Sequence, residues 1–115
     1  MKKTEINFKV ELDDQNVPEK IWWQATDGSP EYSETKTVSI NLWDQEKQNT
    51  LRIDLWSKDL RIDEMKKFYV DILGGMSQSV LTATGDSIIS NKLKILCDEL
   101  VVHIEKELKE GKRST

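Results

Sequence analysis

Few residues of this 115-residue chain have types that support acid–base, nucleophilic or metal chemistry. His103 is the only histidine and Cys97 is the only cysteine. They are too far apart in the chain to share a helix face as residues three or four apart would, so this pair does not predict a metal site. A nucleophilic cysteine also needs a base beside it. We therefore interpret Cys97 as a small core residue and His103 as a structural or surface residue.

Three groups of acidic residues also have explanations that need no catalysis. Asp13-Asp14 lies in a predicted turn, and Asp63-Glu64 lies at a predicted helix start, where the helix dipole favours negative charge. The polar segment 44–49 lacks the ligand spacing and the central glycine of an EF-hand loop. The sequence thus predicts no catalytic residue, no metal ligand and no cofactor site, and we expect a protein that is not an enzyme.

The composition limits the possible partners. Hydrophobic residues make up 37% of the chain and charged residues 33%, and the net charge is -4. This balance disfavours nucleic acid, because affinity for phosphates depends on Lys and Arg. The length suits one domain. We predict a single domain over residues 1–110 and a frayed tail over residues 111–115.

The sequence also gives an expectation for location. Two lysines near the start are not followed by the apolar segment of a secretory signal. No segment approaches the roughly 20 apolar residues of a transmembrane helix. A single cysteine excludes internal disulfides. We therefore expect a cytoplasmic protein without a transmembrane segment.

Alternation of apolar and polar residues predicts four strands, over residues 5–12, 19–25, 35–43 and 51–56. Residues 27–34 are predicted to form a loop. If Leu42 lies opposite Leu51, the same register pairs the remaining apolar residues of the last two strands on one face. Short connections favour antiparallel neighbours, so we predict a four-stranded antiparallel meander.

After the last strand the apolar spacing becomes helical. We predict helices over residues 62–82 and 87–109, with Asp86 or Ser87 capping the second. One sheet face carries thirteen apolar side chains that need cover. The predicted fold is therefore α+β: a four-stranded antiparallel β-sheet (meander) followed by two C-terminal α-helices packed on one sheet face.

Two surfaces are candidates for protein binding. Strand alternation places Trp22, Trp43 and Trp56 on the outward sheet face, with Arg52 among the polar residues around them. Exposed aromatic residues amid polar groups are typical anchors of protein interfaces. The alternative is that neighbouring side chains or a loop cover each tryptophan individually.

The second candidate surface lies on the second helix. There Ile88, Ile95 and Val102 recur every seven residues, away from the main apolar stripe. Such a narrow seam is typical of contacts between helices. It indicates either packing against the first helix or a contact between subunits, and the sequence leaves both open.

Motifs along the first 70 residues resemble the gliding motility protein GldC family. They are VELDD (10–14), VPEKI (17–21), ATDG (25–28), LWD (42–44), TLRIDLW (50–56), KD (58–59) and DEMKKF (63–68). The resemblance implies a small accessory protein of surface gliding, without enzymatic activity or catalytic residues. It implies partners among the proteins of the motility machinery.

The predicted order of strands and helices also resembles the SecB export chaperone, in topology alone. That analogy implies a different function, in which exposed aromatic surface holds unfolded polypeptides. We also expect a homo-oligomer, because both candidate surfaces suit contacts between copies of the chain and the chaperone is commonly a tetramer. The hypothesis we carry forward is a motility accessory that acts by protein–protein interaction, with the chaperone as the alternative.

Overall fold

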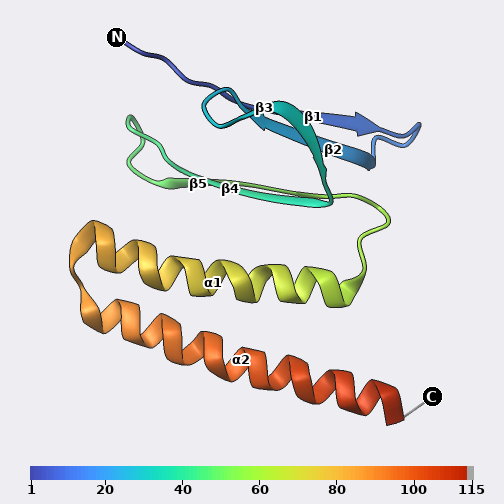
Figure 1. The fold of residues 1–115 in the computed structure, drawn as a ribbon, viewed down its shortest axis with the longest axis vertical. Helices are drawn as coiled ribbons and strands as arrows, with labels where there is room; N and C mark the ends of the chain where they lie inside the picture. Colours follow the sequence, from blue (N-terminus) through green and yellow to red (C-terminus); the bar gives the residue numbers. More distant parts are fainter. Residues whose placement is uncertain (114–115) are drawn as a thin grey trace. The chain divides into compact units, whose positions relative to one another are not determined.

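The computed structural model describes residues 1–113 (Figure 1). Contacts divide the chain into two compact units, one ending at Leu60 and one beginning at Arg61, and each is described by itself. The first unit contains strands and the second contains helices. The elements are β1 (Ile6–Leu12), β2 (Pro18–Ala25), β3 (Ser29–Thr35), β4 (Thr37–Trp43), β5 (Thr50–Trp56), α1 (Ile62–Thr84) and α2 (Ser87–Arg113).

Strands β1, β2 and β3 form an antiparallel sheet with β2 in the centre (Figure 1). The register of β1 on β2 places Phe8 opposite Trp23 and Val10 opposite Ile21. Apolar side chains therefore share one face of this sheet, as the alternation predicted. Ile21, near the middle of β2, is fully buried.

Strands β4 and β5 form a separate two-stranded antiparallel sheet. Leu42 pairs with Leu51, and the same register pairs the other apolar residues of the hairpin with one another. The register predicted from the sequence is confirmed. The hairpin loop is closed by backbone hydrogen bonds between Asp44 and Asn49 and between Gln48 and Asp44.

The predicted α+β class is confirmed, but the prediction of one four-stranded meander is wrong. Five strands within residues 1–113 form one sheet of three and one of two. The strand that the sequence did not predict is β3, which is polar and exposed along most of its length. It is an edge strand, where Pro30 is tolerated and no apolar alternation is needed. Only Lys36 separates β3 from β4, and the chain changes sheet there.

The second unit is an antiparallel hairpin of α1 and α2. Gly85 ends α1 in the left-handed conformation, with φ 73°, and its N–H donates to the carbonyl of Leu81. Asp86 then caps α2, because its carboxylate accepts from the backbone N–H groups of Ile88 and Ile89. The cap predicted at Asp86 is therefore present.

Buried serines hold the two helices together near the connection. Ser77 donates to the carbonyl of Ser90, and Ser90 donates to the carbonyl of Ser77, each at 2.8 Å. Further along, Cys97 Sγ donates to the carbonyl of Val70 at 3.4 Å. A Cβ added at Gly74 would lie 3.5 Å from Cys97 Sγ, which is ordinary contact. Small side chains thus mark where α1 and α2 approach.

Helix α2 runs to Arg113, beyond the predicted end at residue 109. Ser114 and Thr115, part of the predicted frayed tail, lie outside the described residues. The single domain predicted over residues 1–110 and the packing of the helices on a sheet face stay predictions, because the two units are described separately.

Burial of apolar side chains is sparse. Where burial is described, up to residue 111, the buried apolar side chains are Ile21 and Val70. Many of the thirteen residues expected to form a buried sheet face are exposed, including Ile6, Leu42 and Ile53. The expectation that the helices bury this whole face stays a prediction, because the two units are described separately. Much apolar surface of the chain remains in contact with solvent.

Candidate protein-binding surfaces

The most exposed tryptophans lie at opposite ends of one hairpin. Trp43 is 69% exposed and Trp56 is 52% exposed. The register pairs Trp43 with Thr50 and Trp56 with Thr37. Alternation along β4 and β5 therefore places both indoles on the same face, about 20 Å apart along the strands. We call this the tryptophan face, defined by Trp43, Trp56 and the cross-strand pairs between them.

Polar side chains lie between the two indoles. Arg52 pairs with Asn41 across the hairpin, and Asp54 pairs with Ser39. The Arg52 guanidinium lies 3.0 Å from the Asp54 carboxylate, and its side chain is 61% exposed. Asp54 Oδ1 is buried and has no hydrogen-bond partner within the described residues. The predicted site residues Trp43, Trp56 and Arg52 thus share one face.

Trp22 lies elsewhere. It belongs to β2, in the three-stranded sheet, where its register partners are Lys9 and Glu34. Its side chain is only half-buried. Lys9, its neighbour, also lies over the ring of Tyr32, with Nζ 4.3 Å from the ring centroid. Trp22 is therefore flanked by long side chains and does not share a sheet with Trp43 and Trp56, contrary to the single surface expected from alternation.

A cluster that the sequence analysis missed surrounds Lys58, just after β5. Lys58 Nζ lies 2.9 Å from Glu19 Oε1 and 3.2 Å from Asp13 Oδ2. The Lys58 backbone N–H donates to the carbonyl of Pro18. Asp13 also accepts from the backbone N–H groups of Gln15 and Val17. These contacts join the β1–β2 turn to the end of β5, and residues far apart in sequence gave no signal for them.

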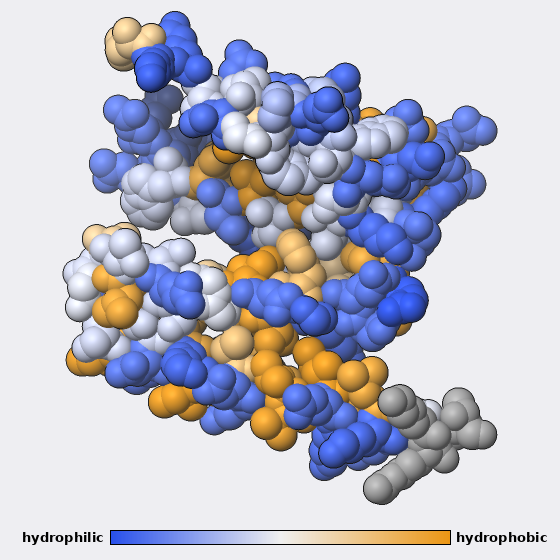
Figure 2. Space-filling model, in the orientation of Figure 1, coloured by the Kyte–Doolittle hydropathy of each residue, from blue (hydrophilic) through white to orange (hydrophobic). Residues whose placement is uncertain are grey.

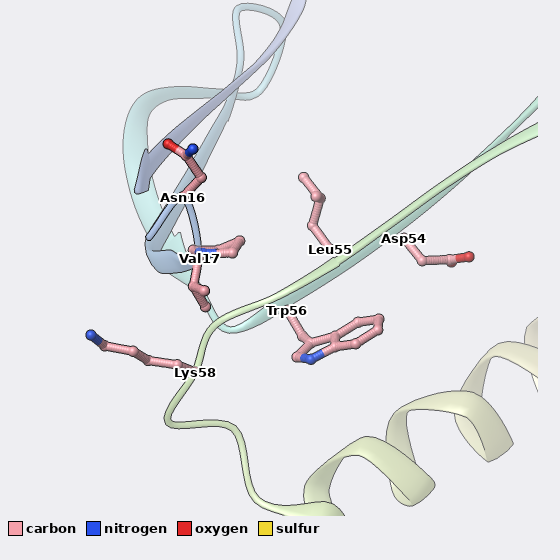
Figure 3. A pocket seen from close by; sticks show the side chains of 7 residues that line it. Asn16, Val17, Asp54, Leu55, Trp56 and Lys58 are labelled. Atoms are coloured by element: carbon pink, nitrogen blue, oxygen red, sulfur yellow. The ribbon is translucent and has the colours of Figure 1, made fainter. Parts of the chain in front are cut away.

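A shallow pocket of about 290 Å³ lies beside this cluster. Figure 3 shows Leu55 and Trp56 on opposite sides of β5, and Val17 on the β1–β2 turn. The hydrogen bonds to Glu19 and Asp13 raise the pKa of Lys58. A lysine that is held protonated is a poor nucleophile. The geometry therefore suits a structural link better than covalent chemistry.

The hydrogen bonds around Asp13 have a consistent electrostatic effect. The backbone N–H groups of Val17 and Gln15 lower the pKa of Asp13, and Lys58 adds to this effect. These contacts stabilise the charged form of the carboxylate. Asp13 is thus suited to holding the turn together and not to acting as a general acid near neutral pH.

The predicted seam on α2 is exposed. Ile88 is 67% exposed, Ile95 58% and Val102 64%. The residues of α2 that bond to α1, which are Ser90, Cys97 and Glu107, lie on other sides of the helix. Packing against α1 therefore does not explain the seam. Figure 2 shows apolar side chains reaching the surface along the helical hairpin.

His103 lies at the surface, in line with its interpretation, whereas Cys97 is less buried than the core residue that we expected. Cys97 is half-buried against α1. His103 is exposed, and its Nε2 lies 2.7 Å from Glu107 Oε1. Glu107 also binds Lys66 of α1 at 2.7 Å, and this hydrogen bond lowers the pKa of Glu107. Within residues 1–113, no three His, Cys, Asp or Glu side chains gather as a metal site would require.

Fold and surfaces together define a class: a small α+β chain that presents tryptophans on a β-hairpin and aliphatic side chains on a long helix. A family model described as gliding motility-associated protein GldC-like matches residues 18–106. The chain belongs to this family. The match begins at β2 and ends within α2, so it includes the tryptophan face and the α2 seam.

Comparisons with curated proteins and with solved structures gave no match. Over the part of the chain that the structure describes, neither helix has the length and apolar character needed to cross a membrane. The family therefore associates the chain with gliding motility. A more specific function has to be argued from the chemistry of its surfaces.

Proposed function

We propose that this protein is a non-enzymatic, cytoplasmic accessory of gliding motility that binds another protein of the motility machinery through the tryptophan face. The observation that carries the proposal is the exposure of Trp43 and Trp56 on one face of one hairpin. Membership of the GldC-like family supports the motility context.

The chemistry of this face favours a protein partner. Tryptophan is enriched among interface hot spots, where truncation often weakens binding by about 2 kcal/mol or more. Arg52, between the two indoles, adds a donor that can pair with a carboxylate or stack on an aromatic ring. The extended arrangement suits a partner that lies across the hairpin rather than a small molecule in a cavity.

The sparse core gives independent support. A folded chain of about 100 residues is only marginally stable, and large exposed apolar areas mark surfaces that bind something else. Here Trp43 and Trp56 are each more than half exposed. Association with a partner would remove part of this apolar area from water.

The experiment is affinity capture from native lysate of a gliding bacterium that encodes the protein. Wild-type bait is compared with Trp43→Ser/Trp56→Ser bait, after circular dichroism shows that both are folded. Leu51→Ser is the matched control, because it removes an exposed apolar side chain from the opposite face of the hairpin. We expect one or two discrete proteins that the tryptophan variant loses and the Leu51 variant keeps.

The exposed apolar area also favours the second candidate, a holdase for unfolded chains, although the four-stranded meander behind the SecB analogy is not present. A holdase would capture many unrelated chains and suppress the aggregation of an unfolded test protein. Discrete capture without suppression supports the accessory. Broad capture with suppression would replace it by the holdase.

A further inference from the structure

We propose that the exposed face of α2 is a self-association surface, on which two copies of this chain pair their α2 helices antiparallel about a two-fold axis between Ile95 and Leu96. The occupant of the seam is thus a second copy. This inference rests on a different surface from the tryptophan face and does not depend on the proposed function.

The apolar part of this face has two parallel rows. One row is Ile88, Ile95 and Val102, and beside it lie the exposed Ile89 and Leu96. Each row repeats every seven residues, which keeps its members on one side of the helix. The aligned segment, from residue 88 to residue 103, is about 22 Å long at ~1.5 Å per residue.

Charged side chains lie between the two rows. At ~100° per residue, Lys92 and Glu99 fall between the row of Ile95 and the row of Leu96 on the helical wheel. Both are exposed. Neither takes part in an ion pair within the described residues, whereas Lys94 and Asp98, on the neighbouring side, pair with each other. An opposite charge from outside the chain can therefore approach both.

An antiparallel alignment satisfies the apolar and charged positions together. With the axis between Ile95 and Leu96, Lys92 lies level with Glu99 of the second copy, and the symmetry repeats the pair. In the same register Ile95 lies level with Leu96 of the second copy. Ile89 lies level with Val102 at either end. A two-fold interface requires such self-complementarity, and here one register provides it.

A parallel alignment does not satisfy the apolar and charged positions together. It would place Lys92 against Lys92 and Glu99 against Glu99 of the second copy, and like charges face to face are unfavourable. Shifting the antiparallel pair by one heptad would restore apolar contacts but would misalign the reciprocal charges. The pattern of charge on α2 therefore specifies both the direction and the register of the pair.

Charge reversal on the purified full chain tests the arrangement. Analytical ultracentrifugation measures the dimer dissociation constant of the wild type, Lys92→Glu, Glu99→Lys and the double variant. We expect each single reversal to weaken the dimer roughly tenfold or more and the double reversal to restore it. Lys94→Glu, on the neighbouring side, is the control and should leave the constant unchanged. A wild type that is monomeric at all concentrations overturns the proposal.

Cysteine crosslinking tests direction and register even where a reversal variant folds poorly. In a Cys97→Ser background, Ile95→Cys should crosslink to itself with a short bismaleimide, because the axis brings these positions together. Ile88→Cys should not, because its copies lie about 22 Å apart along the pair. Equal crosslinking at both positions would indicate a parallel pair and would contradict the arrangement, as would no crosslink at position 95.

Discussion

At the scale of single residues, the polar groups of this chain mainly position its elements. Lys58 joins the β1–β2 turn to the end of β5 through two carboxylates. Ser77 and Ser90 join α1 to α2 through reciprocal hydrogen bonds. An apolar side chain in place of either serine would leave a buried carbonyl without its donor. An apolar side chain in place of Lys58 would remove the link between the turn and β5.

The serine pair should contribute measurably to stability. We expect Ser77→Ala to lower the free energy of unfolding by about 1–2 kcal/mol, because it removes a buried donor from the carbonyl of Ser90. Urea unfolding followed by circular dichroism measures the change. The exposed Ser79→Ala on the same helix is the control. Equal stabilities of the two variants would show that the pair is dispensable.

The ion pair between Lys66 and Glu107 predicts a dependence on acid. The pKa of Glu107 is lowered in the folded chain, so the folded state binds fewer protons than the unfolded state as pH falls. The stabilisation is fully present above the ordinary carboxylate range near 4.5 and is lost as pH falls through the lowered pKa.

We therefore expect Lys66→Met to narrow the difference in urea midpoint between pH 7 and pH 3. The effect is modest, because both side chains are partly exposed. Lys67→Met, which removes only an ion pair within α1, is the matched control. The assignment fails if both variants keep the full acid dependence of the wild type.

At the scale of elements, Gly75 and Gly85 of the helical hairpin have opposite roles. Gly75 lies within α1, and a Cβ there would have no heavy atom within 4 Å. We expect Gly75→Ala to stabilise the chain by about 0.5–1 kcal/mol through helix propensity. Gly85 has φ 73°, so Gly85→Ala should destabilise by about 1–2 kcal/mol. Thermal unfolding measures the change in stability of both variants. A change in the same direction for both variants would contradict this account.

The sequence predicted those elements whose own pattern specifies them. Strands β1, β2, β4 and β5 alternate, so their existence and the β4–β5 register followed from apolar pairing. The helices followed from their spacing and from the cap at Asp86. The sequence did not predict strand β3, because an exposed edge strand is specified by hydrogen bonding to the backbone of β2 rather than by its own side chains.

The candidate surfaces were predictable to a similar extent. Alternation placed Trp43 and Trp56 on one face of the sheet, and these indoles share a face of the hairpin and are exposed. It also grouped Trp22 with them, because it assumed one continuous sheet. The change of sheet at Lys36 separates Trp22 from the other two. The contacts of Lys58 required the folded chain, since its partners lie about 40 residues earlier in the sequence.

At the scale of the whole molecule, few apolar side chains are buried, so we expect the stability of the fold to depend on association. If two copies pair through α2, folding and association are coupled, and the thermal midpoint should rise with protein concentration. We expect a rise of several degrees over a hundredfold range for the wild type and a smaller rise for Lys92→Glu. Differential scanning fluorimetry measures both series. A wild-type midpoint independent of concentration would contradict the coupling.

The central claim is that the tryptophan face binds a protein of the motility machinery. The most direct test is the affinity of the purified chain for the captured partner, measured by isothermal titration calorimetry. We predict that Trp43→Ser/Trp56→Ser weakens binding by roughly 30-fold or more, as expected for hot-spot tryptophans, while Leu51→Ser binds like the wild type. Equal affinities of the wild type and the folded tryptophan variant would contradict the claim.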